Sequence, residues 1–144
     1  MRNMVCKIVL RNHSYMKNPQ IKATEKELEI LQIIWKMRAA SVKDVHEALG
    51  GDDANGYTTI LKLMQIMHEK GLVTREKNGK AHLYDAVHSQ TVMQEHMVDK
   101  MITTVFQGSA ARLVMSALGN NKSSKEELME IRKYLEQLEK GGNS

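Results

Sequence analysis

Residues 56–84 read GYTTILKLMQIMHEKGLVTREKNGKAHLY, and this stretch decides the fold. Its first half predicts an amphipathic helix from about Gly56 to Lys70, closed by Gly71. The apolar positions of that helix recur at i, i+3, i+4 and i+7, and they are Ile60, Leu63, Met64 and Met67.

The second half of the stretch predicts a β-hairpin. Its strands are residues 72–76 and 81–86, joined around Lys77-Asn78-Gly79-Lys80. The Asn-Gly pair favours a type I′ turn, in which both central residues need positive φ. A helix that runs directly into a hairpin is therefore expected.

Two shorter helices are predicted upstream, and each begins with a capping box. Thr24 and Glu27 open the first, which ends near Met37 and carries Leu28, Leu31, Ile34 and Trp35 at helical spacing. Ser41 and Asp44 open the second, which stops at Gly50-Gly51 and directs Val42, Val45 and Leu49 inward. Three helices followed by a hairpin are typical of a winged helix-turn-helix.

Helical patterns return after Val87. Ser89 caps a long helix that ends near Gly108, residues 109–118 predict a short helix, and a last helix carries a near-heptad apolar stripe. That stripe is too short for a stable isolated coiled coil, so it needs a partner surface. The residues expected to form a dimer contact are Met97, Met101, Val105, Leu113, Leu128, Ile131, Leu135 and Leu138.

The predicted fold class is mainly α with a small β-wing, organised in three parts. Residues 1–21 form a flexible basic arm, 22–87 a winged-helix DNA-binding domain, and 88–144 a helical dimerisation domain. An internal methionine, Met16, offers an alternative translation start within the arm.

The central helix presents a polar face suited to DNA. Thr58, Lys62 and Gln65 point away from the apolar stripe, with Thr59 on the flank. Such groups can meet base edges and phosphates in a major groove. Tyr57 at the helix start either stacks on the sugar-phosphate or covers the edge of the core.

Basic residues at the hairpin strengthen this interpretation. Arg75, Lys77 and Lys80 gather near its turn, where they suit phosphate contacts in the flanking groove. Alone, either feature would be no more than a solvated surface. Together they favour a DNA-binding protein.

The net charge of +4 does not by itself indicate DNA binding. Residues 1–23 carry five Lys and Arg and no acid, residues 24–87 carry nine bases against ten acids, and residues 88–144 carry seven against seven. The excess lies in the N-terminal arm. DNA binding by the central part must depend on local clusters of charge.

Several protein classes are disfavoured. Cys6 is the only cysteine, which excludes an internal disulfide framework and fits a reducing cytoplasm. No apolar run reaches the length of a membrane span. No phosphate loop or paired carboxylates are evident and the six histidines are scattered, so we expect no enzyme activity, no metal and no cofactor.

Four stretches carry a family resemblance: TEKELEILQIIWKMRAASVKDVHEAL, YTTILKLMQIMHEKGLVTREKNGKAHLYDAV, FQGSAARLVMSAL and SKEELMEIRKYLEQL. Over about residues 22–139 the chain resembles the penicillinase-repressor (BlaI/MecI/CopY) family of bacterial winged-helix transcriptional regulators. The most specific positions are Thr59-Ile60, Leu63, Met67, Lys70-Gly71-Leu72-Val73 and Tyr84.

The resemblance implies a homodimer with interlocking C-terminal helices that binds a pseudo-palindromic operator and blocks polymerase. In the antibiotic-resistance branch, a membrane sensor with a zinc-metalloprotease domain relieves repression and the repressor is cut at an Asn-Phe bond. Ser116-Ala117 occupies that position here, and the cysteine motif of the copper branch is missing. Ile66 and Tyr57 also stand where many relatives have arginine and proline.

Two alternatives remain open. The near-neutral charge of residues 24–144 is compatible with a winged-helix protein-interaction module. A ligand-responsive regulator of the MarR type would require a pocket between the DNA and dimer domains, and nothing in the sequence specifies one.

Overall fold

The computed structural model describes residues 21–54, 56–120 and 122–141. The predicted arm lies outside these ranges apart from Ile21, which is buried in the core. The chain forms two compact units, one ending at His96 and the other beginning at Met97. None of the described helices is long and apolar enough to cross a membrane.

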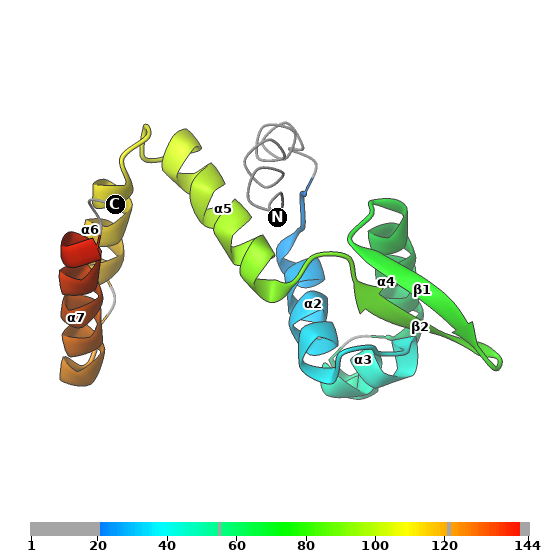
Figure 1. The fold of residues 1–144 in the computed structure, drawn as a ribbon. Coiled ribbons are helices and arrows are strands. Elements are labelled where there is room, and N and C mark those ends of the chain that lie inside the picture. Colours follow the sequence, from blue (N-terminus) through cyan, green and yellow to red (C-terminus); the bar gives the residue numbers. More distant parts are fainter. Residues whose placement is uncertain (1–20, 55, 121, 142–144) are drawn as a thin grey trace. The chain divides into compact units, whose positions relative to one another are not determined.

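The first unit begins with α2 (Glu25–Met37), shown in blue in Figure 1. The predicted capping box is confirmed, because the Glu27 N–H donates to Thr24 Oγ1 at 3.2 Å and the Thr24 N–H donates to Glu27 Oε1 at 2.9 Å. Both donors would otherwise be left unpaired at the helix start.

The predicted capping box of α3 (Val42–Ala48) is also confirmed. The Asp44 N–H donates to Ser41 Oγ at 3.1 Å, and the Ser41 N–H donates to Asp44 Oδ2 at 2.9 Å. This backbone hydrogen bond, then the one from the Ser41 hydroxyl, holds the pKa of Asp44 below its ordinary value. Gly50 then adopts φ 103°, and η1 (Gly51–Asp53) leads on to the next helix.

The central helix, α4 (Tyr57–Glu69), ends in a Schellman motif. Gly71 has φ 82°, its N–H donates to the His68 carbonyl at 3.1 Å, and the Leu72 N–H donates to the Met67 carbonyl at 2.9 Å. The predicted stop at Gly71 is confirmed. Leu72, the first residue beyond it, is buried and leads directly into the hairpin.

The hairpin consists of β1 (Val73–Asn78) and β2 (Ala81–Ala86), paired antiparallel. The predicted Asn78-Gly79 turn centre is wrong: Asn78 pairs with Ala81, so the loop is Gly79-Lys80. Positive φ occurs at Gly79 (69°) and not at Asn78, so the glycine takes the first central position. The expected turn would have placed Lys77 opposite Lys80, whereas the observed register places Lys77 opposite His82 and Lys80 in the turn.

A third extended segment, not predicted, joins the hairpin. The Ala40 N–H donates to the Tyr84 carbonyl at 3.0 Å, and the Tyr84 N–H donates to the Ala40 carbonyl at 2.8 Å. Tyr84 therefore pairs with Arg75 on one side and with Ala40 on the other. This bridge fixes the hairpin beside the start of α3.

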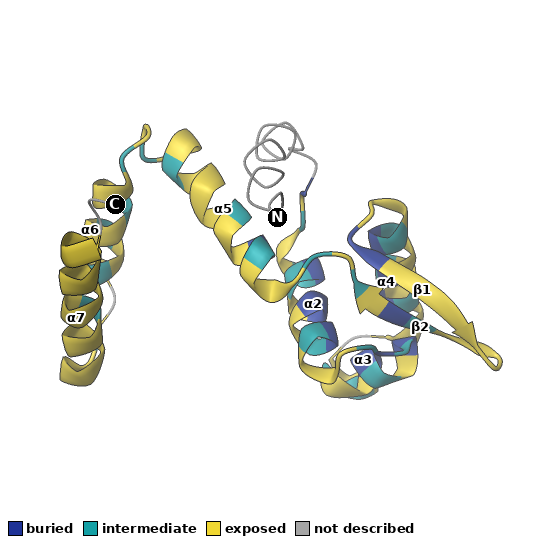
Figure 2. Ribbon diagram, viewed as in Figure 1, coloured by how far each residue is buried: buried dark blue, intermediate teal, exposed yellow. Residues whose placement is uncertain are grey.

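The core of the first unit lies between α2, α3, α4 and the base of the hairpin (Figure 2). The predicted stripe of α4 is there: Ile60, Met64 and Met67 are buried, and Leu63 packs against them. Trp35, expected in the core, is partly buried against it, and its indole N–H donates to the His88 carbonyl at 2.9 Å. Met93 of α5 (Gln90–Thr104) completes the core. Met93 therefore belongs to the compact unit that ends at His96.

Glu27 is a charged residue within this core, with only 2% of its surface exposed. Lys70 Nζ, at the end of α4, donates to Glu27 Oε1 at 2.7 Å. The same oxygen accepts the Thr24 N–H, so the carboxylate is both paired and hydrogen-bonded. A buried carboxylate is tolerated only under these conditions.

The second unit comprises the end of α5 together with α6 (Ala110–Asn120) and α7 (Lys125–Gly141). The predicted cap Ser89 accepts the Val92 N–H at 3.1 Å, and Ser109 and Ser124 cap the next two helices in the same way. From Met97 onward, no residue that the structure describes is buried, and α6 and α7 are almost entirely exposed or intermediate in Figure 2.

We expect Lys70→Ala to lower the free energy of unfolding by about 1–3 kcal/mol, because it leaves the Glu27 carboxylate buried without its cation. Urea unfolding of the full chain measures this value. Lys36→Ala is the matched control, since Lys36 is exposed and forms no ion pair with a described residue. Equal losses in the two variants would contradict a stabilising role for the pair.

Candidate nucleic-acid interface

The outward face of α4 carries the polar residues singled out from the sequence. Ile60, Met64 and Met67 occupy the core side, while Thr58, Thr59, Lys62 and Gln65 are all exposed. The helix thus holds two hydroxyls, an amide and an ammonium group in solvent on a rigid element. These groups can donate to or accept from base edges and phosphates.

Tyr57, the first residue of α4, is 45% exposed. Its ring meets the ring of His46 edge to face, with centroids 5.6 Å apart and an interplanar angle of 76°. His46 is nearly buried, and its Nε2 lies 3.1 Å from Asp52 Oδ1 in η1. The Tyr57 ring is therefore held in place from α3 while part of it remains open to solvent.

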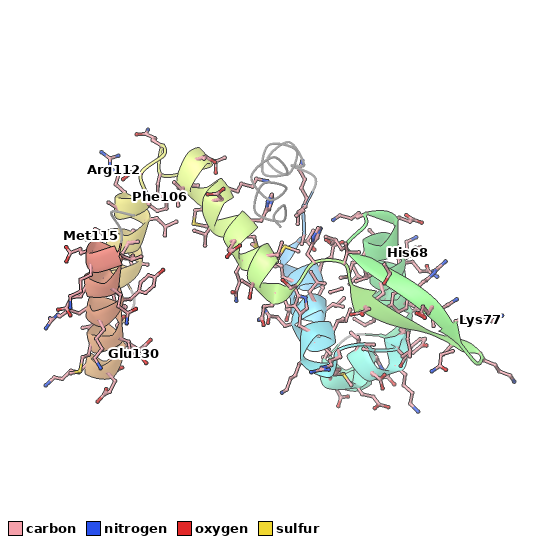
Figure 3. The ribbon with its side chains drawn as sticks, viewed as in Figure 1. His68, Lys77, Phe106, Arg112, Met115 and Glu130 are labelled. Carbon is pink, nitrogen blue, oxygen red and sulfur yellow. The ribbon has the colours of Figure 1, made fainter. Side chains whose placement is uncertain are left out.

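The hairpin presents the predicted cations Arg75, Lys77 and Lys80, all of them exposed. Arg75 lies opposite Tyr84 and Lys77 opposite His82, so these two cations share one face of the hairpin. Lys80 belongs to the turn itself. Figure 3 shows the labelled Lys77 near the tip, away from the core.

A cavity of about 280 Å³ brings two of the predicted residues together. Tyr57 from α4 and Lys80 from the turn both line it. Sequence reasoning missed its other polar lining residues, among them Lys43 of α3 and Tyr84 of β2. No local pattern marks Lys43, because folding alone places it near residues that are far away in sequence.

The apolar residues expected to form a dimer contact are accessible. Met97, Met101, Val105, Leu128, Leu135 and Leu138 are exposed, and Leu113 and Ile131 are intermediate. The sequence analysis overlooked Val98. This residue shares one side of α5 with Ile102 and Val105, at the spacing i, i+4 and i+7. The sequence analysis also omitted the exposed residues Val114, Met115, Met129 and Tyr134. Met115 is labelled in Figure 3.

Within the described residues, no three His, Cys, Asp or Glu side chains are grouped so as to hold a metal ion.

Residues 23–137 match the sequence profile of the penicillinase repressor family. The chain belongs to this family. Among its relatives, the methicillin resistance regulatory protein MecI of Staphylococcus aureus is 24% identical over 83% of this chain and 98% of its own length. The penicillinase repressor of Bacillus licheniformis is 25% identical over 84% and 93%. The transcriptional regulator BlaI of Mycobacterium tuberculosis is 26% identical over 80% and 83%.

Among solved structures, a MarR family protein from Bacillus stearothermophilus has a TM-score of 0.49 at 15% identity, covering 99% of this chain and 90% of that chain. Reduced AbfR bound to DNA has a TM-score of 0.48 at 14% identity, covering 95% and 92%. With the family established by sequence, the chain is a DNA-binding transcriptional repressor and not an enzyme.

Proposed function

We propose that this repressor binds a pseudo-palindromic operator as a homodimer in the cytoplasm. Residues 22–87 of each copy contact DNA, and residues 88–144 hold the two copies together. The second unit carries the main support. Its helices have apolar stripes, yet no described residue from Met97 onward is buried within one chain. Short helices of this kind are marginal without a packed partner.

A second copy of the chain supplies that partner in the simplest way. A two-fold arrangement lets the same stripe cover itself, residue i against j and j against i. The dimer then presents two copies of α4 to half-sites separated by about one turn of DNA. Repression follows because the occupied site is closed to polymerase.

In each half of the proposed dimer, α4 enters the major groove and the hairpin follows the backbone. Thr58, Lys62 and Gln65 contact base edges, with Tyr57 and Thr59 at the entering end of the helix. Arg75, Lys77 and Lys80 contact phosphates. Because these cations are few, affinity depends on two copies binding together.

Release by a sensor-dependent signal completes the proposal. Ser116-Ala117, at the position of the bond cut in some relatives, lies inside α6. Proteolysis there would require local unfolding of the helix first. A membrane metallopeptidase encoded beside this chain would support proteolytic release, and its absence would favour another signal.

Binding itself is tested by a gel shift with the DNA upstream of the chain's own gene. We expect a shift at submicromolar protein in low salt, weaker on random DNA of the same length. No shift at micromolar protein would contradict the proposed function and favour a protein-interaction module.

The double substitution Lys77→Ala, Lys80→Ala should weaken binding to specific and random DNA alike. Loss of phosphate contacts should also flatten the slope of log affinity against log salt by about 1–2 units. Titration across salt concentrations measures this. The matched control is Lys133→Ala, Lys140→Ala, which removes two exposed lysines from α7. An unchanged slope would contradict phosphate contacts by the hairpin lysines.

Lys62→Ala and Thr58→Ala should instead change the preference among operator variants. A base contact is lost at one position only, so discrimination there should fall by about 1–3 kcal/mol. Competition binding with single-base operator variants measures this preference. Equal losses on every sequence would argue against base readout by α4.

Leu135→Glu should raise the dimer dissociation constant at least about 30-fold, because it buries an unpaired carboxylate in the proposed interface. Sedimentation of the full chain measures the association state. Gln137→Glu is the matched control, with the same added charge on the opposite side of α7. A wild-type chain that sediments as a monomer, or a Leu135→Glu variant that dimerises like the control, would contradict the proposed homodimer.

A further inference from the structure

The cavity beside the hairpin has a lining suited to an anion. It lies where the start of α3, the start of α4 and the start of β2 meet. Its ionisable lining residues within the described chain are lysines, a histidine and tyrosines, with no carboxylate among them. The residues that matter are Lys43, Tyr57, Lys80, His82 and Tyr84.

Two lysines reach this cavity from separate elements. Lys43 is the second residue of α3, and Lys80 belongs to the hairpin turn. Lys43 contributes to lowering the pKa of Asp44, but neither lysine forms an ion pair with a described carboxylate. Two lysines that line one cavity give it positive charge, which a bound anion would offset.

Tyr84 adds a donor that the protein itself does not use. Only 1% of the residue is exposed, and its backbone groups pair with Ala40. Its hydroxyl has no hydrogen-bond partner among the described residues. The hydroxyl oxygen is not among the fully buried side-chain atoms that lack a partner, so it keeps access to solvent and can donate to an acceptor in the cavity.

We infer that this cavity binds one phosphodiester group of the DNA backbone, held by Lys43, Lys80 and the Tyr84 hydroxyl. Phosphate oxygens accept strong hydrogen bonds from ammonium and hydroxyl donors. Tyr57 lines the cavity at the start of α4, so the bound phosphate would set the position at which that helix enters the groove. This inference rests on the proposed function and adds Lys43 and Tyr84 to the DNA contacts.

Tyr84→Phe is the sharpest variant, because it removes one oxygen and keeps the ring in the core. The melting temperature should not fall, since no described group loses a hydrogen bond. Affinity for a random-sequence duplex should fall about 2- to 5-fold. A wild-type affinity in a folded Tyr84→Phe protein would overturn the role of the hydroxyl.

Lys43→Ala should weaken binding to the same duplex about 3- to 10-fold, by loss of a charge-assisted contact. Lys36→Ala is the control of equal charge, because Lys36 lies on α2 and is not one of the lining residues. Two double variants test whether Lys43 and Lys80 contact the same phosphate. The losses of Lys43→Ala and Lys80→Ala should be less than additive in the double variant, whereas Lys43→Ala and Lys77→Ala should add.

The outcomes separate the inference from the proposed function. If the wild-type chain binds no duplex, the proposed function fails. If it binds duplex but Lys43→Ala behaves like Lys36→Ala, or all pairs are additive, only the phosphate site fails. Inorganic phosphate is then titrated alone and followed by the NMR signals of His82. Saturable phosphate binding together with unchanged DNA affinity in Lys43→Ala would assign the cavity to a free anion and overturn the inference.

Discussion

The double pairing of the Tyr84 backbone is the constraint on which the proposed DNA-binding side of the first unit depends. One edge of Tyr84 pairs with Arg75 in β1, and the other exchanges two hydrogen bonds with Ala40 just before α3. Both Ala40 and Tyr84 are buried, so separating them would leave backbone donors and acceptors unpaired away from water. The hairpin is consequently fixed relative to α3, and the cavity between them exists because of this attachment.

The Glu27–Lys70 pair has a comparable role at the other end of α4. It joins the end of α4 to the capping box of α2, while the Schellman motif turns the chain at once into β1. Helix and hairpin therefore emerge from one rigid junction with a set direction. Such rigidity matters for a DNA-binding protein with few cations for phosphate contacts, because little binding energy remains to order a mobile surface.

Much of this fold was predictable because its signals are local. Capping boxes at Thr24 and Ser41 involve residues three positions apart, and the stop at Gly71 needs only a residue that tolerates positive φ. The predicted Asn78-Gly79 turn centre was wrong. The local preference of Asn-Gly for turns takes no account of the strand pairing, and that turn would have paired Lys77 with Lys80. The Ala40 bridge and the place of Lys43 were not predicted, since neither leaves a periodic pattern in the chain.

The sequence by itself determined the order of helices and hairpin, the apolar stripe of α4 and the family, because each follows from spacing within a few residues or from matched motifs. Tertiary structure alone decided the Gly79-Lys80 turn, the burial of Glu27 and the meeting of Lys43, Lys80 and Tyr84 in one cavity. The physical reason is that the burial of Glu27 and the cavity depend on contacts between residues about 40 positions apart, and the turn depends on how two whole strands pair. Propensity and periodicity describe only the surroundings of a residue along the chain.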